Sequence, residues 1–131
     1  MIVKALEDIL GTERDVSGPG WNSRRLLLAS DRMGFSLTDT IIKKGAALEL
    51  EYTHHLEACY CIEGKGQIRA ADSETWQSLE PFTLYALDRH DRHVVQATDA
   101  DLRLVCVFTP PLSGQEVHRD DGSYAPTENL E

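Results

Sequence analysis

Short apolar or alternating stretches, separated by glycine, proline and polar residues, follow one another through most of this chain. Alternation with a period of two places successive side chains on opposite faces of a strand, and clusters of turn residues separate neighbouring strands. Many short strands at near-regular spacing indicate an all-β sandwich or barrel. The pattern predicts strands near residues 25–28, 35–43, 46–53, 56–63, 66–71, 75–79, 83–88, 93–98 and 102–109.

The first eleven residues have a different period. Val3, Leu6, Ile9 and Leu10 fall on one helical stripe, and Gly11 follows them as a helix stop. We expect a short helix here, and one or two short helices in the whole of an all-β fold.

Glycine and polar residues mark where the predicted strands turn. In CIEGKGQI, Gly64 and Gly66 stand between two apolar runs, which predicts a hairpin at this point. AADSETW has the composition of a second turn between strands.

The end of the chain changes in character after the last apolar run. Pro110 and Pro111 end the last strand, because proline cannot donate a hydrogen bond to a neighbouring strand. The length fits one domain over residues 1–131. We expect residues 110–131 to form a C-terminal tail or a lid over the domain.

The charge narrows the range of partners. The chain has 13 Lys and Arg against 22 Asp and Glu, a formal net charge of −9. Nucleic acids and anionic membranes bind basic surfaces, so we expect neither, and predict a small-molecule substrate. No apolar run is long enough to span a membrane, and the N-terminus lacks the pattern of a secretory signal. A cytoplasmic location follows as the expectation.

Three cysteines, Cys59, Cys61 and Cys106, lie within apolar runs. Their odd number and apolar surroundings fit reduced core thiols better than a disulfide framework. Cys59 and Cys61 are separated by one residue, so they do not form a redox CxxC motif.

Glu57 is the acidic residue in an otherwise apolar stretch after two adjacent histidines. His54 and His55 cannot both reach one site if they lie on a strand, because neighbouring side chains point to opposite faces. On a strand over 57–62, Glu57 shares a face with the cysteines, and both faces are otherwise apolar, as in a strand buried on both sides. A carboxylate there needs a cation, a metal or several donors. The alternative is a solvent-exposed glutamate at a frayed strand start.

Two further candidates come from residues 81–95. Tyr85 lies on one predicted strand, and His93 begins another after the polar turn DRHDR. On a barrel, Glu57, Tyr85 and His93 could converge from three strands. A carboxylate, a phenol and an imidazole would suit a divalent iron-type or zinc ion with open coordination positions. The alternatives are a hydrogen-bonded histidine and a core tyrosine.

This region resembles the two motifs of the cupin superfamily. The first motif, G(x)5HxH(x)3,4E(x)6G, keeps E(x)6G from Glu57 to Gly64, and His93 falls on the histidine of the second motif, G(x)5PxG(x)2H(x)3N. Leu50 and Tyr52 stand in place of the first-motif histidines. The resemblance implies a cupin-type β-barrel, with two of the four usual metal ligands present.

Several separate stretches agree in order and spacing with one enzyme family: MIVKALEDILGTERDV, GPGWNSRRLLLASDRMGFSLTDT, YTHHLEACYCIEGKG, YALDRHDRHVV and CVFTPPLSGQEVHRDDGSYAP. Through them the whole chain, from residue 1 to about 126, resembles the ectoine synthase family. The resemblance implies the cyclisation of Nγ-acetyl-L-2,4-diaminobutyrate to the compatible solute ectoine with loss of water. It also implies a homodimer and an iron-dependent site ligated by Glu57, Tyr85 and His93. By their chemistry, the same ligands would accept zinc in place of iron.

The same resemblance implies a set of substrate-binding residues. Arg25 is the candidate for the substrate carboxylate, because its guanidinium can bind a carboxylate through two hydrogen bonds. Taken alone, each of these residues could equally be core, a surface ion pair or a solvated tail. The full set is Trp21, Arg25, Thr40, Tyr52, Phe108, Glu116 and His118.

Ring closure also requires proton transfer, for which Tyr52 and Glu116 are the candidates beside the three metal ligands. Two other functions stay open at this stage. An iron-dependent cupin dioxygenase would consume oxygen, whereas a non-catalytic cupin would only bind a small molecule.

Overall fold

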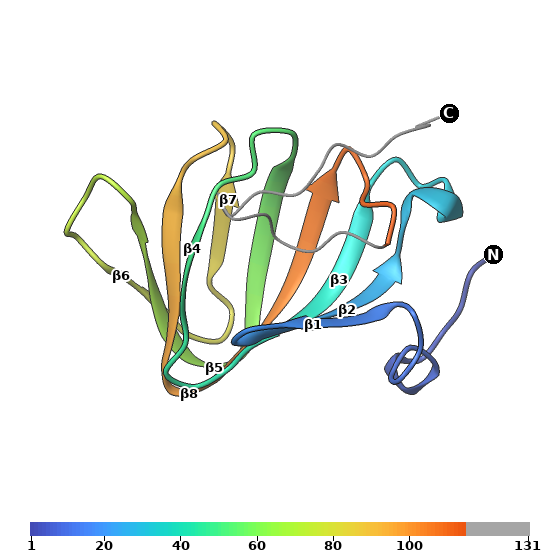
Figure 1. Cartoon of the computed structure of the whole chain (residues 1–131), viewed down its shortest axis with the longest axis horizontal. Coiled ribbons are helices and arrows are strands. Elements are labelled where there is room, and N and C mark those ends of the chain that lie inside the picture. The colour runs from blue at the N-terminus through green and yellow to red at the C-terminus, as the bar shows by residue number, and fades with distance from the viewer. Residues whose placement is uncertain (115–131) are drawn as a thin grey trace.

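The computed structural model describes residues 1–114, and the strands among them form one sheet (Figure 1). Antiparallel pairing joins every neighbouring strand, in the path β1-β2-β3-β8-β5-β6, with β4 on β8 and β7 on β5. The elements are η1 Leu6–Asp8, β1 Asp15–Gly18, β2 Trp21–Leu27, η2 Ala29–Asp31, β3 Ser36–Ile42, β4 Ala47–Leu50, β5 Leu56–Ala70, β6 Gln77–Leu79, β7 Leu84–Leu87 and β8 His93–Thr109.

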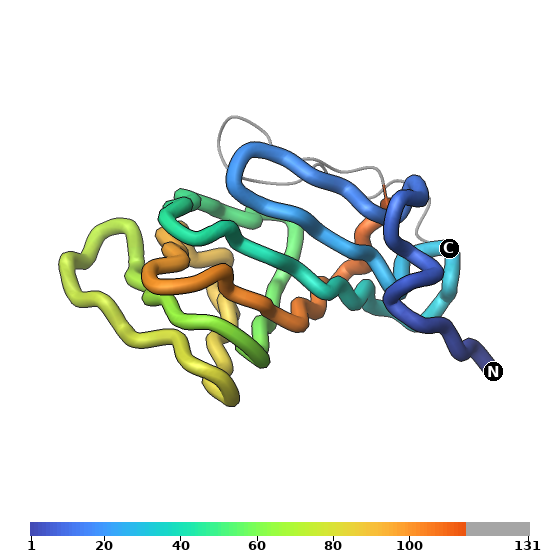
Figure 2. The backbone as a smooth tube through the Cα atoms, turned by 90° about the horizontal axis from the view of Figure 1, so that it is seen from below, coloured from blue at the N-terminus to red at the C-terminus, as the bar shows by residue number. Residues whose placement is uncertain are grey.

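β5 and β8 are the two longest strands, and the two ends of each pair with different neighbours, so the sheet has two halves. β8 pairs with β4 over residues 93–96 and with β3 over 102–108, while β5 pairs with β7 over 57–60 and with β6 over 66–68. The β5–β8 ladder shifts register where these halves meet. The loop between β5 and β6 lies at one end of the molecule and the N-terminal residues lie at the other (Figure 2). The all-β prediction is confirmed.

The predicted hairpin at Gly64 is wrong, because the chain continues through this point as one strand. Gly64 has φ +91°, and a Cβ on it would overlap the backbone of Asp101 on β8. The glycine therefore permits an irregularity in a continuous ladder rather than a reversal of the chain. The turn predicted at AADSETW is confirmed between β5 and β6.

Several strand boundaries also differ from the prediction. The sequence pattern missed β1, and it divided β8 into two strands at residues 98–102. β4 ends at Leu50, so Tyr52 follows the strand instead of lying on it. The short helix near the N-terminus is present as η1, and the last strand ends at Thr109, before the prolines, as predicted.

The inner and outer faces of β5 are unequal. Glu57, Cys59 and Cys61 are buried, whereas Tyr60 on the opposite face is 41% exposed and lies against exposed Phe82, with ring centroids 6.4 Å apart. The prediction of burial on both faces is wrong, because this antiparallel sheet turns only one face to the core.

The core lies between the two halves of the sheet and takes more side chains from β8 than from any other strand. Cys59, Cys61 and Cys106 are buried in the core as free thiols, as predicted. Within residues 1–114, no helix has the length and apolar character that crossing a membrane would require.

Candidate active site

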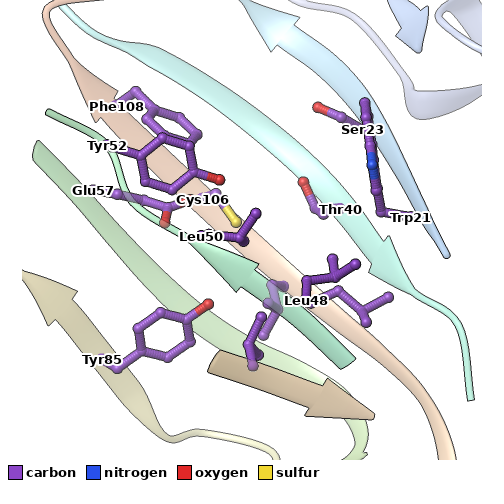
Figure 3. A pocket seen from close by; sticks show the side chains of 13 residues that line it. Trp21, Ser23, Thr40, Leu48, Leu50, Tyr52, Glu57, Tyr85, Cys106 and Phe108 are labelled. Carbon is purple, nitrogen blue, oxygen red and sulfur yellow. The ribbon is translucent and has the colours of Figure 1, made fainter. Parts of the chain in front are cut away.

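A cavity opens among the inward-facing side chains of β2, β3, β4, β5, β7 and β8. About 30 Å³ of it is open to the centre of a water-sized sphere, so the cavity between these side chains is narrow. Figure 3 shows Trp21, Ser23 and Thr40 on one side, with Tyr52, Glu57 and Phe108 across from them. Its lining is Trp21, Ser23, Thr40, Ile42, Leu48, Leu50, Tyr52, Glu57, Tyr85, Val95, Leu104, Cys106 and Phe108.

The β2–β3 side carries one aromatic ring and two hydroxyls. Trp21 and Ser23 are two positions apart on β2, so their side chains share the inner face of the strand. Ser23 lies opposite Thr40 in the β2–β3 ladder. The Trp21 indole lies so close to Gly18 that a Cβ there would overlap it. Thr40 shares a 2.9 Å hydrogen bond with the hydroxyl of Thr38. This wall offers polar groups that can orient a ligand under an indole cover.

Aromatic rings form the opposite side of the cavity. Tyr52 meets Phe108 edge-to-face, with ring centroids 5.1 Å apart, and His55 also meets Phe108 edge-to-face, at 6.0 Å. His90 donates from Nδ1 to the carbonyls of Tyr52 and His55, at 2.8 and 3.0 Å. The DRHDR turn therefore holds the loop that presents Tyr52.

Glu57 carries a carboxyl group that is 7% exposed at the start of β5. Burial raises the pKa of Glu57 to about 7, although hydrogen bonds from the thiols of Cys59 and Cys106 lower it. The carboxyl group therefore changes charge near neutral pH. A bound cation would hold it ionised.

Tyr85 lies on β7 directly opposite Cys59. Its hydroxyl points into the cavity in Figure 3. Burial raises the pKa of the Tyr85 phenol well above its usual range, and Cys59 and Glu57 add to the effect when they are ionised. Without a cation nearby, the phenol therefore keeps its proton.

His93 begins β8, and its side chain is 2% exposed. Its Nδ1 donates a 2.9 Å hydrogen bond to the carbonyl of Asp91, which leaves the lone pair on Nε2. That Nε2 is buried and has no hydrogen-bond partner among the described residues. Burial lowers the pKa of His93, so the ring stays neutral. A neutral, oriented imidazole with a free lone pair is the state that binds a metal.

The ring of His93 lies close to the two tyrosines of the site. Its centroid is 6.4 Å from that of Tyr85 and 6.1 Å from that of Tyr52. A carboxylate, a phenol and an imidazole are chemically suited to a divalent metal, and the buried Nε2 fits that use.

The cavity brings together most of the residues that the sequence analysis named. Arg25 and His93 are not among its lining residues in the described chain. Arg25 is fully buried on the same face of β2 as Ser23, and its Nε donates to the Ser23 hydroxyl at 3.2 Å. Glu116 and His118 lie outside the described residues. The predicted site residues that line the cavity are Trp21, Thr40, Tyr52, Glu57, Tyr85 and Phe108.

Sequence reasoning missed Ser23, Cys106 and His90 as parts of the site. Ser23 shares strand parity with Trp21, which was a usable signal. Cys106 meets Cys59 across the β5–β8 ladder, with their Sγ atoms 3.4 Å apart. No sequence signal indicated that contact, because it joins positions 47 residues apart.

Comparison with known proteins places the chain in a family. The model of the family described as ectoine synthase matches residues 1–128. The chain belongs to the ectoine synthase family. An L-ectoine synthase from Desulfatibacillum aliphaticivorans is 55% identical over 126 residues, which are 95% of this chain and 96% of that relative. As a member of this family, the chain is an enzyme of the hydro-lyase type.

Solved structures agree with this placement. The crystal structure of ectoine synthase from P. lautus matches with a TM-score of 0.86 at 49% identity, over 97% of this chain and 90% of that one. A cupin-2 domain from Rhodospirillum rubrum matches with a TM-score of 0.61 at 16% identity, over 72% of this chain and 62% of that one. The second likeness concerns the fold alone, and it confirms the predicted cupin-type architecture of this ectoine synthase family member.

Proposed function

We propose that this chain closes Nγ-acetyl-L-2,4-diaminobutyrate to the compatible solute ectoine, by an intramolecular condensation that releases water. Membership of the ectoine synthase family supports the reaction. The observation that carries the proposal is one cavity lined by Trp21, Thr40, Tyr52, Glu57, Tyr85 and Phe108, which come from separate parts of the chain.

The proposal includes a divalent metal, Fe(II) with Zn(II) as a possible substitute, held by Glu57, Tyr85 and His93. When bound, such an ion supplies Lewis acidity toward the acetamide oxygen of the substrate. The buried, unpartnered Nε2 of His93 among the described residues supports this ligand set. The raised pKa of Glu57, about 7, also supports it, because a cation would compensate the buried charge.

The cavity walls would hold the substrate in a reactive conformation. Both reacting groups belong to one short molecule, so orientation supplies much of the rate. Trp21 and Phe108 exclude water from the two sides, which favours loss of water over the reverse hydrolysis. We assign the substrate carboxylate to Arg25, reached beside Ser23, and hydroxyl contacts to Thr40.

The attacking amine must lose a proton and the leaving oxygen must gain one. We assign these transfers to Tyr52 and Glu116, with His118 as a further substrate contact. Replacement of Tyr52 by Phe keeps the ring that packs on Phe108 and removes only the hydroxyl. We expect Tyr52→Phe to lower kcat by about 100-fold while metal content stays the same. Normal turnover by this variant would remove Tyr52 from the mechanism.

The function is tested with the purified full chain and synthetic Nγ-acetyl-L-2,4-diaminobutyrate. Metal analysis of the protein accompanies an assay of ring formation by NMR, with and without a chelator, and an oxygen electrode follows the same reaction. We expect ectoine to form without oxygen uptake and the rate to fall when the metal is removed. Oxygen uptake coupled to turnover would indicate the dioxygenase alternative, and binding without conversion would indicate the non-catalytic one.

A homodimer and a cytoplasmic location complete the proposal. Exposed Met1, Ile2, Val3 and Met33 lie around an apolar groove, which supports burial against a second copy. Free buried cysteines are consistent with a reducing compartment. Light scattering during gel filtration measures the mass in solution, and a monomer at micromolar concentration would contradict the dimer.

A further inference from the structure

Two thiols lie beside the buried carboxyl group of Glu57. Ligand atoms of Glu57, Cys59 and Cys106 all lie within 4.8 Å of one another, and all three residues are buried. The Sγ atoms of Cys59 and Cys106 are 3.4 Å apart. This cluster is not explained by the proposed reaction, which uses Glu57 with Tyr85 and His93.

The strand pairing holds this cluster in place. Cys59 and Cys106 are directly opposite each other in the β5–β8 ladder, and Glu57 lies two residues before Cys59 on the same face. Cys59 is fully buried and Cys106 is 3% exposed. The donor atoms are therefore fixed by the sheet and do not depend on a flexible loop.

The spacing matches that of two thiolates on one metal ion. With zinc–sulfur bonds of about 2.3 Å and tetrahedral angles, two thiolate sulfurs lie about 3.8 Å apart. The 3.4 Å found here differs from that by a small side-chain rotation, and the carboxylate oxygen stands within reach of the same point. Water or the phenol of Tyr85, which lies opposite Cys59 in the β5–β7 ladder, completes a four-coordinate set.

We propose that Glu57, Cys59 and Cys106 form a thiolate-containing site for borderline and soft divalent ions, with Zn²⁺ and Cd²⁺ as the ions it favours. Binding converts two thiols to thiolates and releases their two protons to solvent. Two thiolates and one carboxylate then surround the dication. Thiolate ligands select such ions over the harder Fe²⁺.

This site goes beyond the proposed function and does not depend on it. It shares Glu57 with the proposed iron site, so an ion held by the thiols removes a ligand from that site. Occupancy of the two sites is therefore mutually exclusive. Zinc or cadmium bound at the thiols would exclude iron even though neither ion needs His93.

The test is a titration of Cd²⁺ and Co²⁺ into the metal-free full chain, followed by ultraviolet and visible absorption. Thiolate coordination produces sulfur-to-metal charge-transfer bands, which carboxylate, phenol and imidazole ligands cannot produce. We expect these bands to saturate at one ion per chain. Absence of the bands from protein that binds either ion would overturn the proposal.

Four single variants identify which residues ligate the ion that produces the band. Cys59→Ala and Cys106→Ala should each change the band and weaken Cd²⁺ binding at least about tenfold. Cys61→Ala is the matched control, because Cys61 is equally buried on β5 but its thiol bonds to the Glu63 carbonyl at 3.4 Å. His93→Ala should keep the band while losing the proposed iron site.

The proposal is overturned if Cys59→Ala or Cys106→Ala keeps the full band and affinity, or if Cys61→Ala loses the band. Circular dichroism of each variant checks that it is folded, and the wild-type spectrum is decisive should one variant not fold. A negative result in the ring-formation assay would leave the thiolate band unchanged. Failure of this site and failure of the proposed function are thus distinguishable.

Discussion

Glu57 and Asp39 are two carboxyl groups that are equally buried, each 7% exposed, on opposite faces of the same sheet. Asp39 accepts hydrogen bonds from Arg24 at 2.6 Å and from Arg103 at 2.7 Å. Although burial raises the pKa of Asp39, the hydrogen bonds of the two arginines lower it below its usual range. Glu57 faces thiols and a phenol instead, and its pKa rises to about 7.

The difference shows that burial alone does not decide the charge of a carboxyl group. On the outer face, two guanidinium groups compensate Asp39 and tie β2, β3 and β8 together. On the inner face, Glu57 has thiols as hydrogen-bond partners, and burial dominates its pKa. One carboxyl group is therefore ionised at neutral pH, and the other changes charge near it.

The largest expected effect comes from removing the Glu57 charge. We expect Glu57→Gln to lose bound metal and to lower kcat/KM for ring formation by at least about 10³-fold, because the metal ligand set is broken. Asp39→Asn is the matched control, with metal content and kcat/KM per folded molecule unchanged. Full metal content in Glu57→Gln would contradict the assignment of this residue as a ligand.

The two carboxyl groups should respond to pH with opposite signs in the metal-free protein. The folded state holds the Glu57 proton more tightly than the unfolded chain does, so the unfolding free energy falls as pH rises from about 4.5 toward 7, by up to about 3 kcal/mol. Asp39 stabilises the fold above its unfolded pKa, and that contribution is lost as the pH falls below about 4.

Chemical denaturation of the metal-free wild type, Glu57→Gln and Asp39→Asn across this pH range separates the two contributions. Glu57→Gln should gain stability relative to the wild type between about pH 5 and about pH 8. A constant difference over that range would show that the carboxyl group titrates normally and would remove the contrast with Asp39.

A smaller effect is expected from breaking the ion pairs of the outer face. Asp39→Ala should lower the unfolding free energy by about 2 kcal/mol, between the values for exposed and buried pairs, because Arg24 and Arg103 keep some contact with solvent. Thermal unfolding measures this loss. Reduced metal binding by folded Asp39→Ala would mean that the two faces are coupled.

Much of the fold could be predicted from alternation and turn residues, since these act over a few neighbouring positions. At Gly64 this local reasoning predicted a hairpin that is not there. Its local sequence is that of a hairpin, but its backbone passes close to Asp101 on β8 within a continuous strand. A glycine needed for close approach and a glycine needed for a turn look alike in sequence.

Individual residues of the candidate site could be predicted from the sequence, but not all of the contacts between them. Strand parity placed Glu57 with Cys59 on one face, and residues 81–95 offered Tyr85 and His93 as candidates, which the family resemblance then gave as metal ligands. The contact of Cys59 with Cys106 was not predictable, because it depends on the register of β5 against β8. A shift of one residue in that register would turn one of the two thiols away from the other.

Local patterns along the chain were enough to decide that strands form, roughly where they lie, and which of their side chains face the same way. They were enough because period-two alternation and turn residues depend on neighbours in sequence. Only the folded chain decided which strands meet and which charges are compensated. Asp39 meets its arginines, and Glu57 meets thiols, through contacts between distant strands whose energies no short stretch of sequence contains.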